Sequence, residues 1–79
     1  MKDEIIKILK DIQPTYDFEH SENFVEEGLL DSFDIVELVS DLEKKYKIVI
    51  SALEIVPENF SSVEGIINLI KKSKKIIKN

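Results

Sequence analysis

Apolar residues near the start of the chain recur at intervals of three and four positions: Ile5, Ile8, Leu9 and Ile12. This spacing places them on one face of a helix and predicts an amphipathic helix over residues 2–12. Asp3 and Glu4 fall in its first turn, where the helix dipole favours negative charge. Pro14 then stops helical hydrogen bonding, so we expect the helix to end there.

A second helical pattern follows in the middle of the chain, with apolar residues at Ile35, Leu38, Val39, Leu42 and Tyr46. Asp31 precedes it and suits an N-cap, because its carboxylate can accept hydrogen bonds from the free amides of the first turn. The second helix is therefore predicted to begin at Ser32.

Residues 13–30 show neither a helical nor a strand period and include Pro14 and Gly28. They predict a long loop, and a loop of this length in a compact domain is either functional or held by its own side chains. Large apolar side chains are available for holding it: Phe18, Phe24, Leu29 and Leu30. We expect their role to be structural.

The β-branched residues after the second helix, at positions 48–50, would suit a strand. The sequence offers no evident pairing partner, and an isolated strand leaves its backbone groups unpaired. We therefore predict a loop over residues 47–50.

Two possible capping boxes mark helix starts in the last third of the chain. Ser51 with Glu54 predicts a short third helix, which Pro57 limits. Ser61 with Glu64 predicts a final helix carrying an apolar stripe of Val63, Ile66, Ile67 and Ile70. The lysine-rich residues 71–79 are expected to be the fraying, solvated end of that helix. The fold class predicted is all-α: a small four-helix bundle of three main helices and a short third one, with a long first loop.

A chain of 79 residues has room for one core, so we expect a single domain over residues 1–79. There is no cysteine, which excludes disulfides and thiol nucleophiles. The start of the sequence has neither a secretory signal nor a membrane span, so we expect a cytoplasmic monomer without membrane insertion.

Charge is unevenly distributed, within a net charge of −5. Between Asp11 and Glu43 there are many acidic residues and no lysine or arginine, while lysines lie at the start of the chain and after Glu43. Such an acidic block repels nucleic acid, which we do not expect as a partner. The block is either a solvated surface or a docking face for basic proteins.

Candidate catalytic and metal-binding residues are few. His20 is the single histidine and lies in a polar part of the loop beside Ser21, without a rigid setting for a general base. The acidic residues do not have the spacing of a calcium-binding EF-hand loop. We expect neither an enzyme nor a metal site.

Residues 28–38 read GLLDSFDIVEL. This run resembles the attachment segment of acyl and peptidyl carrier proteins, in which the serine of an Asp-Ser-Leu element at the start of the second helix bears 4'-phosphopantetheine from coenzyme A. The resemblance covers nearly the whole chain, including the helix lengths, the long loop and residues 60–63. It implies a carrier protein, itself not an enzyme, with the arm attached at Ser32. Phe33 replaces the usual leucine.

Other departures bear on the pathway. The stretch over residues 51–60 is slightly longer than in carriers of fatty acid biosynthesis and more like that of D-alanyl and peptidyl carriers. Ser40 stands where the family often has methionine, and Lys44 ends the acidic run early. The cargo is left open between a fatty acyl chain, an amino acid and a polyketide unit.

The resemblance also implies partners: a phosphopantetheinyl transferase, an acyl- or aminoacyl-loading ligase, and a downstream synthase or transferase. Val36 lies one turn after Ser32 and off the main apolar stripe, so we expect it to form an exposed apolar pair with Phe33. The docking face predicted consists of Asp31, Phe33, Asp34, Val36, Glu37 and Asp41. The alternative function is a helical adaptor that uses this acidic face to bind a basic protein non-covalently.

Overall fold

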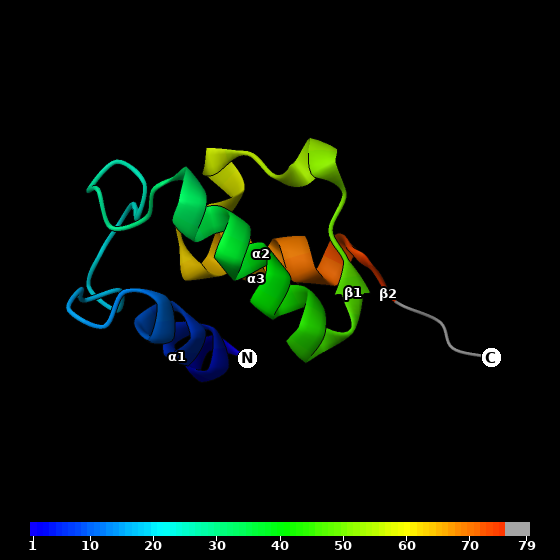
Figure 1. Cartoon of the computed structure of the whole chain (residues 1–79), viewed down its shortest axis with the longest axis horizontal. Coiled ribbons are helices and arrows are strands. Elements are labelled where there is room, and N and C mark those ends of the chain that lie inside the picture. Colours follow the sequence, from blue (N-terminus) through cyan, green and yellow to red (C-terminus); the bar gives the residue numbers. More distant parts are fainter. Residues whose placement is uncertain (76–79) are drawn as a thin grey trace.

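The computed structural model describes residues 1–75 (Figure 1). Its elements are, in order, α1 (Lys2–Ile12), α2 (Ser32–Tyr46), β1 (Ile48–Val49), the 3₁₀ turns η1 (Ala52–Glu54) and η2 (Pro57–Phe60), α3 (Val63–Lys72) and β2 (Lys74–Lys75). The predictions of a helix over residues 2–12 and of a second helix that begins at Ser32 are confirmed.

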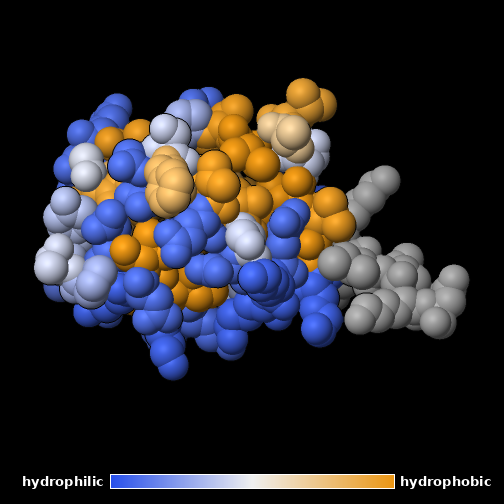
Figure 2. Space-filling model, viewed as in Figure 1, coloured by the Kyte–Doolittle hydropathy of each residue, from blue (hydrophilic) through white to orange (hydrophobic). Residues whose placement is uncertain are grey.

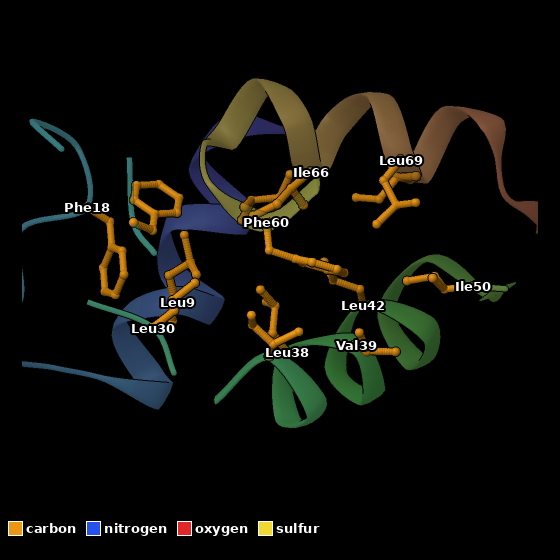
Figure 3. Close-up of a cluster of buried hydrophobic side chains, with 14 of the residues drawn as sticks. Leu9, Phe18, Leu30, Leu38, Val39, Leu42, Ile50, Phe60, Ile66 and Leu69 are labelled. Atoms are coloured by element: carbon orange, nitrogen blue, oxygen red, sulfur yellow. The ribbon is translucent and has the colours of Figure 1, made fainter. Parts of the chain in front are cut away.

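The three α-helices bury their apolar stripes against one another. Helix α1 packs against both α2 and α3, and Figure 3 shows side chains from these helices and from η2 pointing into a shared core. Leu38, Leu42 and Phe60 lie in it without solvent exposure. Burying such side chains stabilises the fold by about 1.5–3 kcal/mol each relative to leaving them in water.

The end of α2 is joined to the start of α1 by polar contacts. The Tyr46 hydroxyl donates to Glu4 Oε1 at 3.1 Å, and Lys45 Nζ lies 3.6 Å from Glu4 Oε2. Burial of the phenol, together with the neighbouring Glu4 carboxylate, raises the pKa of Tyr46 to about 12. These contacts hold α1 and α2 side by side at the end of α2 remote from Ser32.

The connection over residues 13–31 contains turns and neither helix nor strand. Phe18 and Phe24 are buried and pack edge to face, with ring centroids 5.2 Å apart. The Phe24 amide donates to Ser61 O at 2.8 Å, which ties the connection to the start of α3. Gly28 has φ +77°, a conformation that glycine adopts without strain. The aromatic residues thus have the structural role expected of them.

The prediction of a loop over residues 47–50 was wrong. Ile48 and Val49 form β1, which pairs antiparallel with Lys75 and Lys74 of β2. The pairing partner comes from the lysine-rich tail, which the sequence predicts to be the end of the last helix. Helix α3 instead ends at Lys72, and the rest of the tail, residues 76–79, lies outside the described residues.

The short third helix takes a different form from the one predicted. Two 3₁₀ turns replace an α-helix, and Ser51 caps the first by accepting from the Leu53 amide at 3.3 Å. Glu54 does not complete a capping box, because its carboxylate pairs with Lys72 Nζ at 2.9 Å and accepts from Asn59 Nδ2 at 3.1 Å. The segment is therefore fastened to α3 by polar contacts.

The N-cap predicted for the last helix is displaced by one residue, and the predicted capping box does not form because the third helical residue is Gly65. Ser62 is the N-cap of α3, and its Oγ accepts from the Gly65 amide at 3.0 Å. The Ser61 hydroxyl donates to Pro57 O at 2.8 Å.

None of the helices in the described part of the chain combines the length and hydrophobicity that crossing a bilayer requires.

Candidate functional site

The site begins with the N-cap of α2. Asp31 has an extended backbone, and its Oδ1 accepts from the Asp34 amide at 2.8 Å. In return, the Asp31 amide donates to Asp34 Oδ2 at 3.3 Å, which completes a capping box. The predicted cap at Asp31 is confirmed. The reciprocal role of Asp34 was missed, although the three-residue spacing of two acidic residues could have indicated it.

Ser32 follows the cap as the first residue of α2 and is exposed. Its hydroxyl makes no hydrogen bond to any group within residues 1–75, and within the same range neither its own amide nor that of Phe33 has an acceptor. Unpaired amides and the positive end of the helix dipole favour an anion at this position. The side chain is thus an unhindered alcohol in a setting that tolerates a phosphate ester.

Asp34 does not belong to an exposed surface, contrary to the docking face predicted. Its side chain is buried, with 7% of the residue exposed. Besides the Asp31 amide, Asp34 Oδ2 accepts from Gln13 Nε2 at 3.0 Å. A buried carboxylate needs hydrogen-bond donors, and the Asp31 and Gln13 amides provide them. Gln13 had not been singled out because its contact with Asp34 is long-range in sequence.

Phe33 and Val36 form the exposed apolar pair that the sequence predicts, with 79% and 66% of each residue exposed. In the same view as Figure 1, Figure 2 shows apolar surface over α2 and the segment that follows β1. Asp31 and Glu37 are exposed beside the pair, while Asp41 is half-buried. Residues with such large exposed apolar side chains are candidates for contact with a partner.

Most other serine hydroxyls are engaged in local structure. Ser62 and Ser51 accept from backbone amides as caps, and the Ser73 hydroxyl donates to Leu69 O at 2.7 Å. Within residues 1–75, Ser40 is the other serine whose hydroxyl has no hydrogen-bond partner, and it lies inside α2, where the backbone amides are already paired. Among the serines, Ser32 is the one that both lies at a helix start and has a hydroxyl without a hydrogen bond within residues 1–75.

His20 lies in the exposed connection, where its Nδ1 is 2.6 Å from Asp17 Oδ2. Hydrogen bonding to Asp17 raises the pKa of His20, and the same contact lowers the pKa of Asp17. The pair stabilises a turn, and within residues 1–75 no third group joins it to form a catalytic set. In the described part of the chain, no group of three or more His, Cys, Asp or Glu side chains is placed to hold a metal ion.

Comparison with known protein families gives a match over most of the chain. A family model described as "Phosphopantetheine attachment site" matches residues 2–70, which is most of the chain. No curated protein and no solved structure matches. The match covers α1, α2 and α3 as far as Ile70, and it includes the start of α2 with its exposed serine. The chain therefore belongs to the phosphopantetheine-attachment family of carrier proteins, whose prosthetic group is covalently bound 4'-phosphopantetheine.

Proposed function

We propose that this chain carries an acyl or aminoacyl group as a thioester on 4'-phosphopantetheine attached to Ser32, and presents that group to biosynthetic enzymes. The observation that carries the proposal is the exposed, unengaged hydroxyl of Ser32 at the first position of α2. Other serines in the described range that have hydrogen-bonded hydroxyls would lose a structural contact on esterification.

The chemistry asked of the chain is limited. The Ser32 hydroxyl loses its proton to the transferase, and its oxygen forms the new ester bond to phosphorus as the nucleotide part of coenzyme A leaves. When bound, the arm supplies a thiol, which this cysteine-free chain lacks, and holds the cargo there as a thioester. The unpaired amides of Ser32 and Phe33 favour the negative charge of the phosphodiester.

Mass spectrometry of the intact protein tests the attachment. The unmodified protein is incubated with coenzyme A and a broad-specificity phosphopantetheinyl transferase, and its mass is expected to rise by one phosphopantetheinyl group. Ser32→Ala should show no gain. Ser40→Ala is the matched control, because it removes the other unengaged hydroxyl of α2, and it should gain the group like the parent. An unmodified parent would contradict the proposal and favour the non-covalent adaptor.

We propose further that Phe33 and Val36, with Asp31, Glu37 and Asp41 around them, form the surface that docks partner enzymes. Apolar contact supplies affinity, and the carboxylates steer basic partners. The partners are the transferase, a loading ligase and a downstream synthase or transferase. The acidic run that contains these residues has no lysine or arginine to neutralise it.

Charge reversal tests this surface. Glu37→Lys should slow arm transfer at low salt by a factor of roughly 2–5, the scale of an exposed charge interaction, and the deficit should shrink as salt screens the field. Asp3→Lys is the control: it makes the same charge change on an exposed residue beside Glu4, which contacts the remote end of α2. Equal slowing by both variants would show that net charge matters and that the proposed surface does not.

A further inference from the structure

One side chain connects the end of α1 to the start of α2. The backbone amide of Gln13 caps α1 by donating to Leu9 O at 2.9 Å. Its side-chain amide donates to Asp34 Oδ2 at 3.0 Å, across 21 positions of sequence. Gln13 therefore fixes the distance between the two helix ends on either side of the long connection.

The contact is made to the capping box that encloses Ser32. Asp31 and Asp34 exchange hydrogen bonds over this residue, at 2.8 and 3.3 Å, and the Asp34 side chain is buried. An ordinary exposed capping box stabilises its own helix and touches nothing else. Here the carboxylate of the box also accepts from a neighbouring helix, so the first turn of α2 is held relative to α1.

We infer that Gln13 and Asp34 are positioning residues for Ser32, which set the place and direction of its hydroxyl for the phosphopantetheinyl transferase. The inference rests on the proposed attachment at Ser32. The Ser32 hydroxyl has no hydrogen bond of its own within residues 1–75, so its position depends on the backbone of the first turn. A displacement of about 1 Å at a reacting group is enough to slow a reaction up to about a hundredfold.

This role differs from that of a charged docking residue, because Asp34 acts as a hydrogen-bond acceptor inside the protein. The two roles respond differently to substitution. Asp34→Asn removes the charge but keeps an oxygen that can accept from both Gln13 and the Asp31 amide. Asp34→Ala removes the charge and the acceptor together. Gln13→Ala leaves Asp34 in place and removes the link to α1.

The first experiment measures kcat and KM for transfer of the arm onto each variant. Gln13→Ala and Asp34→Ala should each lower kcat about tenfold, with KM changed less than about twofold. Asp34→Asn should recover most of the kcat lost in Asp34→Ala. A docking role would instead raise KM in both Asp34 variants with kcat retained, and that result would overturn the inference.

Ser62→Ala is the matched control for stability. It removes a cap from α3, as Asp34→Ala disturbs the cap of α2, and it leaves the surroundings of Ser32 intact. Its kcat should equal that of the parent at a similar loss of thermal stability. If Ser62→Ala slows transfer as much as Gln13→Ala does, the effect is general destabilisation and the positioning role is refuted.

A second measurement needs no enzyme. Amide hydrogen exchange of the unmodified protein should be faster at Asp31 in Gln13→Ala than in the parent, and unchanged at Gly65, the amide capped by Ser62. In Ser62→Ala, exchange should be faster at Gly65 and unchanged at Asp31. Unchanged exchange at Asp31 in Gln13→Ala would contradict the inference. Because Gln13 is half-buried at a helix end, this variant should fold even if Asp34→Ala does not.

The outcomes separate this inference from the proposed function. If the parent gains no arm, or if Ser32→Ala still gains one, the attachment proposal fails. If the parent gains the arm at Ser32 while Gln13→Ala matches its kcat, the attachment stands and the positioning role fails.

Discussion

The starts of α2 and α3 use the same capping chemistry with different results. Each begins after a buried apolar residue, Leu30 or Phe60, and each has a side-chain oxygen that accepts from the amide of the third helical residue. At α3 the cap is Ser62, and the first helical residue is the half-buried Val63. At α2 the cap is Asp31, and the first helical residue is the exposed Ser32.

A shift of one position therefore decides whether a serine is structural or available. As a cap, Ser62 has its oxygen engaged by the Gly65 amide. Directly after a cap, Ser32 is exposed and its hydroxyl makes no hydrogen bond within residues 1–75, while Asp31 does the capping. The Asp-Ser pair at the start of α2 thus separates the capping oxygen from the oxygen of the proposed attachment. This division is a physical reason for the pair of residues at the proposed site.

The largest effects are expected in the core beneath the two starts. Leu42→Ala on α2 and Ile66→Ala on α3 remove side chains without solvent exposure, and each should lower the free energy of unfolding by about 2–5 kcal/mol. Val36→Ala, on the exposed face of α2, should change it by less than about 0.5 kcal/mol. Chemical denaturation measures all three. Parent-like stability of Leu42→Ala would show that the helical stripes do not form the core.

Removing the caps should have a smaller effect, equal in kind at both helix starts. Asp31→Ala and Ser62→Ala should each cost about 0.5–2 kcal/mol of stability, the usual range for loss of an N-cap. Urea unfolding followed by circular dichroism gives the two values under the same conditions. If either substitution left stability unchanged, the corresponding hydrogen bond would not contribute to stability, and the two helix starts would not be capped in the same way.

The ends of the two helices differ as well, and a glycine substitution tests this. The residue that follows α2, Lys47, has φ +54°, whereas the residue that follows α3, Ser73, has an extended backbone. The left-handed conformation costs a non-glycine residue about 1–2 kcal/mol. Glycine avoids this cost, but part of the gain is lost because an unfolded chain with glycine has more conformational entropy. Lys47→Gly should raise the free energy of unfolding by up to about 1 kcal/mol and so raise the melting temperature slightly. Ser73→Gly should lower it.

Acid should weaken two polar contacts, one in the connection before α2 and one at the end of α3. A hydrogen bond from the Ser21 hydroxyl lowers the pKa of Glu27 in the connection before α2, and the Lys72 ammonium lowers the pKa of Glu54 beside α3. A carboxyl whose pKa is lower in the folded protein stabilises it above its unfolded pKa of about 4.5. This contribution is lost as the pH falls through the lower, folded pKa. The denaturant concentration at the midpoint of unfolding should therefore decrease as the pH is lowered from about 5 to about 3. Glu54→Gln should make this decrease smaller.

Much of the fold followed from local patterns, because helical spacing and capping residues depend on neighbours in sequence. The bounds of α1 and the start of α2 are examples. The errors involved distant partners. Ile48 and Val49 were assigned to a loop because their partners, Lys74 and Lys75, lie in a polar tail without strand character.

The same limit applies to the candidate site. The exposure of Phe33 and Val36 could be predicted from the helical period alone. The burial of Asp34 could not, since it depends on Gln13 at the end of another helix. An acidic residue on the expected docking helix was assigned to the surface by its type, and its tertiary contact reversed that assignment.

The most direct test of the account is to locate the arm. After transfer from coenzyme A, the protein is digested and the modified peptide is fragmented in a mass spectrometer. We expect one phosphopantetheinyl group per chain, on Ser32. A group found on Ser61, Ser62 or any other residue would contradict the claim that the start of α2 presents the reactive hydroxyl.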